Sequence, residues 1–153
     1  MKKVFVYNES TGNFDLYYHL AGKDITLSCL HLDEKKNLWM GTTSNGLYCL
    51  SGDKKISQPV TRGNIASIYE DSSKELWICT WEEGLYRIKT DSTIENFRHD
   101  PKNPNSICTD FVRSCCEDNA GNLWIGTFHG LNRYEKSTGK FQLYTANANK
   151  PDG

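Results

Sequence analysis

A ten-residue segment containing Leu-Trp recurs three times in this sequence, over residues 33–42, 71–80 and 118–127. In every copy an aspartate stands six residues before the tryptophan. The tryptophans are 38 and 47 residues apart. A repeat of this length constrains the fold strongly, because each copy must form the same unit and bury its apolar face against its neighbours.

Each copy belongs to a longer pattern of four short segments. An apolar run precedes it, over 27–32, 65–69 and 112–116, and a Gly-Leu segment follows it after a loop. A last segment, over 54–58, 93–98 and 140–145, comes after a polar turn. Turns rich in Asp, Asn, Ser, Lys and Gly favour tight reversals between strands. The pattern predicts an all-β protein, a β-propeller fragment with antiparallel four-stranded blades.

The first residues repeat the last part of this pattern. Residues 6–17 match residues 133–144 at a constant offset of 127. The chain is therefore expected to hold about three and a half blades. The outer two strands of an incomplete blade occupy 1–18, and complete blades occupy 19–60, 61–98 and 99–145. The last blade begins with a long connection containing Pro101 and Pro104, which disfavour strand pairing. Residues 146–153 begin the next connection, and the abrupt ends indicate an excised fragment.

These residues resemble the two-component regulator propeller repeat. The resemblance is carried by Asp118, by Leu-Trp-Ile-Gly-Thr at 123–127, by Gly-Leu-Asn-Arg-Tyr at 130–134, and by the Thr-Gly turn before Phe141. The connection 99–106 is similar to that between blades of the family. Two departures are Cys79 at a glycine position and the missing Thr-Gly turn in the second blade. The resemblance implies the periplasmic sensor region of a bacterial hybrid histidine kinase, and a role in sensing carbohydrate.

Composition and motifs narrow the functions further. A net charge of -1 gives no general attraction to nucleic acid or to an anionic membrane, and no stretch is long and apolar enough for a signal peptide or a membrane span. Six cysteines form no CxxC pair, so we expect unpaired thiols and no metal. The four histidines are scattered, and no phosphate loop or nucleophile elbow occurs. No cofactor and no catalysis are expected.

Residues that recur once per blade are interpreted as structural. Aspartate at a fixed place in a turn usually caps that turn through its own backbone. Tryptophan at a fixed place in each blade usually packs between sheets. This interpretation covers Asp33, Trp39, Asp71, Trp77, Asp118 and Trp124.

Candidate ligand-binding residues lie in loops that differ between blades. Trp81 and Phe128 fall outside the repeat pattern and offer apolar platforms for a sugar ring or a peptide. Asn45, Glu82, Glu83 and His129 are candidates to surround them with hydrogen bonds, and Arg62 and Lys102 are the cationic contributions expected from the connections. The alternative interpretation is that these residues line the channel mouth or contact an adjoining domain.

The sequence is compatible with three functions. The first is a non-catalytic sensor for an oligosaccharide or another small ligand, the second is a scaffold for protein interactions, and the third is a propeller lyase or hydrolase. Other blades of a parent receptor are expected partners. Because an open run of blades leaves sheet surfaces uncovered, the isolated chain is also expected to form a homo-oligomer.

Overall fold

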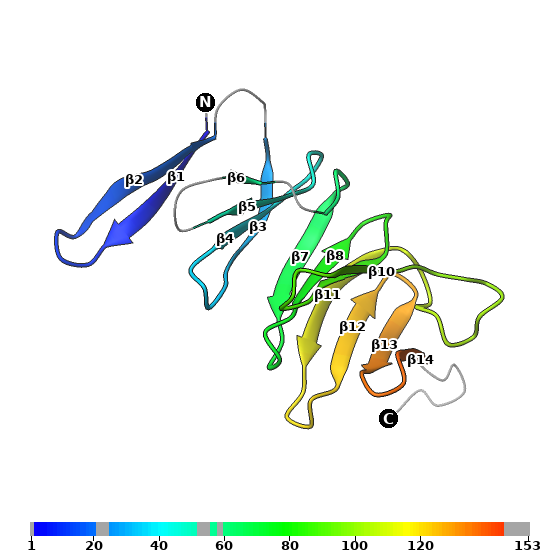
Figure 1. The fold of residues 1–153 in the computed structure, drawn as a ribbon. Helices are drawn as coiled ribbons and strands as arrows, with labels where there is room; N and C mark the ends of the chain where they lie inside the picture. Colours follow the sequence, from blue (N-terminus) through cyan, green and yellow to red (C-terminus); the bar gives the residue numbers. More distant parts are fainter. Residues whose placement is uncertain (1, 21–24, 52–55, 58–59, 146–153) are drawn as a thin grey trace, which may run out of the picture.

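The computed structural model describes residues 2–20, 25–51, 56–57 and 60–145, and the regular structure in them is entirely β-strand (Figure 1). The strands form one two-stranded sheet and three four-stranded sheets, all antiparallel. Within each sheet, strands that are consecutive in sequence are neighbours. The predicted all-β class of four-stranded propeller blades is confirmed.

The strand bounds follow the repeat closely. The N-terminal hairpin consists of β1 (Lys2–Asn8) and β2 (Asn13–Leu20). The first blade contains β3 (Leu27–Leu32), β4 (Leu38–Thr42), β5 (Leu47–Leu50) and β6 (Ile56–Ser57). The second contains β7 (Ile65–Glu70), β8 (Leu76–Thr80), β9 (Leu85–Ile88) and β10 (Ile94–Phe97). The third contains β11 (Val112–Glu117), β12 (Leu123–Thr127), β13 (Gly130–Glu135) and β14 (Lys140–Tyr144).

Two expectations reach beyond the described residues. The last strand of the first blade was expected over 54–58, of which the structure describes 56 and 57 as β6. The connection expected over 146–153 lies outside the described residues.

The apolar core lies between successive blades, which follow one another along the chain in Figure 1. Between the second and third blades, Trp77 and Leu85 on one sheet pack with Val112, Ile125 and Tyr134 on the next. Between the first and second blades, Trp39 and Leu47 pack with Ile65 and Ile78. Full burial of a large apolar side chain contributes about 1.5–3 kcal/mol, so blade stacking is a main source of stability.

Glycine is required where β4 and β8 turn into the following strands. Gly46 and Gly84 have φ values of 76° and 79°, which side-chain-bearing residues rarely adopt. A Cβ atom on Gly46 would also lie 1.7 Å from the carbonyl oxygen of Thr61, and one on Gly84 would lie 2.3 Å from that of Phe97. The connection to the next blade thus passes directly over this turn.

Candidate ligand-binding site

The repeated aspartate and tryptophan of each blade contact one another. The indole N–H of Trp39 donates to Asp33 Oδ2 at 2.9 Å, and the equivalent distances in the second and third blades are 2.9 and 2.8 Å. The other carboxylate oxygen accepts a backbone N–H across the turn at 2.8 to 3.0 Å, from Asn37, Glu75 and Asn122.

These contacts also determine how the three carboxylates titrate. Burial disfavours the charged forms of Asp33 and Asp71, but hydrogen bonds led by those from Trp39 and Trp77 outweigh it and lower the pKa of each. The indole of Trp124 is the main cause of the lowered pKa of Asp118. The aspartates are therefore held ionised at the turns, with their oxygens already engaged.

The meander places two kinds of loop on opposite edges of the blades. The loops between the second and third strands lie beside the connections that enter each blade, and we call this edge the loop face. The backbone N–H of Trp81 donates to Asn64 at 3.1 Å, and that of Phe128 donates to Phe111 at 3.2 Å. The aspartate turns lie on the opposite edge, which we call the turn face.

An aromatic cluster with one arginine lies on the loop face. The ring centroids of Trp81 and Phe128 are 5.9 Å apart, and Phe111 lies 6.1 Å from Phe128. The guanidinium carbon of Arg113 lies 4.5 Å from the centroid of Trp81 and 5.9 Å from that of Phe128. Phe128 is 61% exposed and Phe111 41% exposed. These four residues, the loop-face cluster, join the second blade to the third and present apolar rings and a cation to solvent.

The remaining candidate residues have other positions. Glu83 turns inward, where its carboxylate accepts from Tyr86 Oη at 3.0 Å and from the hydroxyl of Thr61. Burial, followed by this bond to Glu83, raises the pKa of Tyr86. Glu83 therefore links its loop to the connection before the second blade and is not aimed at the loop-face cluster.

The other hydrogen-bonding candidates are divided between blades. Asn45 lies in a loop of the first blade, where its side-chain amide donates to Ser44 Oγ at 3.2 Å. Arg62 is exposed in the following connection, and Lys102 is exposed in the connection to the third blade. Glu82 and His129 are exposed beside Trp81 and Phe128 in sequence, and the carbonyl of Glu82 accepts from Arg98 at 3.1 Å.

Phe111 and Arg113 were missed by reasoning from the loops alone. Arg113 occupies the strand position held by Ser28 in the first blade and Ala66 in the second. Departure from the repeat singled out Trp81 and Phe128, and the same criterion applied to the first strands would have found Arg113.

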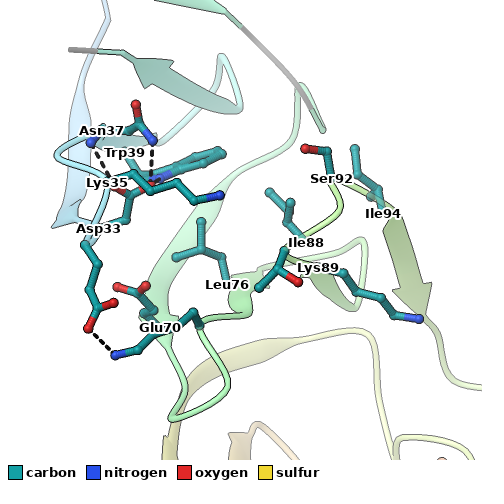
Figure 2. A pocket seen from close by; sticks show the side chains of 13 residues that line it. Asp33, Lys35, Asn37, Trp39, Glu70, Leu76, Ile88, Lys89, Ser92 and Ile94 are labelled. Carbon is teal, nitrogen blue, oxygen red and sulfur yellow. Dashed lines mark hydrogen bonds and ion pairs between the residues drawn. The ribbon is translucent and has the colours of Figure 1, made fainter.

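A pocket of about 390 Å³ lies on the turn face, between the first and second blades (Figure 2). Trp39, Leu76 and Ile88 form apolar parts of its lining, and Ile94 and Thr90 border it at the turn of the second blade. Lys74 pairs with Glu34 across the two blades, and His31 Nε2 lies 3.2 Å from Glu70. The pocket combines apolar walls with charges of both signs.

Two features are absent from the described residues. Within those ranges, no group of three or more His, Cys, Asp or Glu side chains is arranged to hold a metal ion. The same part of the chain forms no helix of the length and hydropathy needed to cross a membrane.

Comparison with solved structures confirms the propeller architecture. The extracellular domain of a hybrid two component system from B. thetaiotaomicron gives a TM-score of 0.70 at 21% identity, covering 78% of this chain and 18% of that one. A one component system from the same organism gives 0.68 at 23% identity, over 93% of this chain and 19% of its extracellular domain. Virginiamycin B lyase from Staphylococcus aureus gives 0.71 at 17% identity, over 97% of this chain and 50% of the enzyme. The chain thus spans less than a fifth of those extracellular domains.

Sequence comparison finds one family that matches two segments of the chain. No curated protein matches this sequence. The sequence model of the family described as Two component regulator propeller matches residues 60–82 and 106–129, which cover the aspartate turns and Leu-Trp strands of the second and third blades. These two segments therefore match two component regulator propeller repeats, and they lie in a chain that folds as a run of propeller blades.

Proposed function

We propose that this chain is a ligand-sensing part of an extracytoplasmic sensor, and that it binds oligosaccharide on the loop face without catalysing a reaction. The observation that carries the proposal is the loop-face cluster, in which the half-buried ring of Trp81 and the exposed ring of Phe128, from two blades, converge around Arg113. The extracellular domains of a one component and a hybrid two component system that share this fold support the location and the sensing role.

The chemistry of the loop-face cluster suits a sugar. The apolar face of a pyranose ring packs against aromatic rings such as the tilted pair of Trp81 and Phe128, which lie at 54° to one another. The guanidinium of Arg113 already rests over Trp81, so its N–H groups are held in place to donate to sugar oxygens. Because the cluster spans two blades, a bound ligand would contact both and influence their packing.

Glycan-array screening followed by calorimetric titration tests this proposal. We expect saturable binding of an oligosaccharide, weakened about tenfold or more by Trp81→Ala and by Phe128→Ala, since buried aromatic anchors dominate such sites. Leu30→Ala removes an exposed apolar side chain of the first blade and serves as the matched control. Binding that survives both aromatic substitutions would refute the site.

Two results would favour the competing functions. Cleavage of the bound oligosaccharide, followed by mass spectrometry, would indicate a lyase or hydrolase. Absence of any glycan binding would leave the protein-interaction scaffold as the better interpretation.

A further inference from the structure

The N-terminal hairpin exposes an aromatic pair that is buried where the same pair recurs. The centroids of Tyr7 and Phe14 are 5.3 Å apart, and those of Tyr134 and Phe141, which stand 127 residues later, are 4.8 Å apart. Both pairs join directly opposed strand positions. Tyr134 and Phe141 are 2% and 5% exposed, whereas Tyr7 and Phe14 are 56% and 70% exposed.

The difference comes from what covers the pair in the third blade. There the second blade supplies Trp77 and Phe97, whose rings lie 5.3 and 5.2 Å from that of Tyr134. Arg87 from the same blade lies over Trp77 and, at 5.7 Å, over Tyr134. The junction between the second and third blades is therefore a template for how this aromatic pair is covered.

The third blade carries, on the face turned away from the second blade, side chains equivalent to those with which the second blade covers the pair. By strand register, Trp124, Arg133 and Tyr144 hold the positions of Trp77, Arg87 and Phe97. The rings of Trp124 and Tyr144 are 5.3 Å apart, comparable with 5.9 Å for Trp77 and Phe97. Tyr144 is 39% exposed, and Leu131, at the position of Leu85, is 41% exposed.

Arg133 is the counterpart of Arg87 on this surface, and its contacts within the blade differ from those of Arg87. Arg133 Nη2 donates to Gln142 Oε1 at 3.2 Å and its Nε atom is buried without a partner, whereas Arg87 Nε donates at 2.9 Å to Glu95, which stands at the position of Gln142. Arg87 also lies over Tyr134, a ring supplied by the next blade. The equivalent ring for Arg133 would be a tyrosine at the position of Tyr7 in a further unit.

We propose that two copies of this chain associate head to tail through these surfaces. The leading face, made of Phe5, Tyr7, Phe14 and Leu16 on the hairpin, docks on the trailing face, made of Trp124, Leu131, Arg133 and Tyr144 on the third blade. The occupant is a second copy because each chain carries both halves of a contact that its own second and third blades already make. The interface joins two different surfaces, so each partner keeps one of them free.

Complementary variants test the arrangement directly. Phe14→Asp blocks the leading face and Tyr144→Asp blocks the trailing face, and each puts a charge where an aromatic ring would be buried. We expect the unmodified chain to associate in a concentration series measured by light scattering. The self-association of each variant alone should be weakened about tenfold or more. An equal mixture of the two variants should form a heterodimer through the remaining intact pair of faces.

The mixture also shows that both variants are folded. Ile94→Asp, which alters an exposed apolar residue of the second blade, is the matched control and should associate like the unmodified chain. The proposal is overturned if the unmodified chain stays monomeric throughout the series, which would leave both faces to flanking blades of a longer protein. It is equally overturned if Tyr144→Asp alone associates normally, or if the mixture forms no heterodimer.

Discussion

The two junctions between complete blades use the same framework but are filled differently. Between the second and third blades, Tyr134, Lys136 and Phe141 fill the space next to Trp77 and Asp71. Between the first and second blades, the corresponding strand and turn positions hold Ile88, Thr90 and Ile94.

The smaller side chains leave the turn-face pocket open. Ile88, Thr90 and Ile94 all line it. The charges differ as well, because Lys136 Nζ lies 2.9 Å from Asp71 and 2.6 Å from Glu117, whereas Thr90 brings no cation to Asp33 and Glu70. The comparison teaches that the repeat determines where blades meet, and that the residues between its fixed positions determine how tightly they meet.

Replacement of the repeated tryptophan at each junction should reveal the difference in packing between the two junctions most strongly. Trp77→Ala should lower the free energy of unfolding by about 3–5 kcal/mol, because Trp77 is fully buried against the rings of Phe97 and Tyr134 and its removal leaves a cavity that the neighbouring side chains do not fill. Trp39→Ala should cost less, since Trp39 already borders the pocket. Urea denaturation of both variants measures this, and equal losses would contradict the comparison.

Replacement of Lys136, the half-buried lysine of the tighter junction, should have the next largest effect on stability. Lys136→Thr recreates the residue of the looser junction and leaves the buried Asp71 and Glu117 without their cation. We expect a loss of about 1–3 kcal/mol, set by the cost of an unpartnered buried charge that is partly relieved by solvent. Lys140→Thr changes an exposed lysine of the same blade and is the matched control in the same assay. A loss no greater than that of the control would argue against the ion cluster.

Acid should weaken the tighter junction through the same carboxylates. The hydrogen bond from Lys136 is the main cause of the lowered pKa of Glu117, and it adds to that of Trp77 in lowering the pKa of Asp71 against the effect of burial. A carboxylate with a lowered pKa stabilises the fold above its unfolded pKa of about 4, and this stabilisation is lost as the pH falls towards the folded value.

Stability should therefore fall from about pH 5 downward, and the fall should be shallower in Lys136→Thr. Thermal unfolding followed across this range measures both slopes. Parallel curves for the two proteins would show that Lys136 does not set these pKa values.

Adding a lysine to the looser junction, between the first and second blades, should have the smallest effect on stability. Thr90→Lys supplies a cation towards Asp33 and Glu70, but Asn37 already donates to Asp33 Oδ2 at 2.9 Å and His31 already faces Glu70. We expect a gain of less than about 1 kcal/mol in the free energy of unfolding, as for partly exposed ion pairs. A gain as large as the loss in Lys136→Thr would mean that the two junctions differ by the lysine alone.

Much of the fold was predictable because the repeat aligns the chain with itself. The strand expected over 27–32 coincides with β3, and the fixed spacing of Asp33 and Trp39 places their side chains within hydrogen-bond distance. The pocket was not predictable, because the turn after Ile88 is one residue shorter than the turn after Tyr134. Only the strand register shows which residues of the two turns correspond.

The candidate site was predictable only in part for a related reason. Trp81 and Phe128 stood out as departures from the repeat, and the structure brings their rings together. Arg113 is distant in sequence from Trp81 and meets it only because the second blade stacks on the third. Glu83 looked available in the sequence, but its orientation depends on Tyr86 and on Thr61 in the preceding connection.

The indole N–H resonances of the four tryptophans offer the most direct measurement of ligand binding on the loop face. Trp39, Trp77 and Trp124 donate to the aspartates of the turn face, whereas Trp81 lies in the loop-face cluster. In ¹⁵N-labelled protein titrated with an oligosaccharide selected on the array, the Trp81 signal, assigned with Trp81→Phe, should shift saturably while the other three stay nearly constant. Saturable shifts at the other three tryptophans with none at Trp81 would contradict the proposed site.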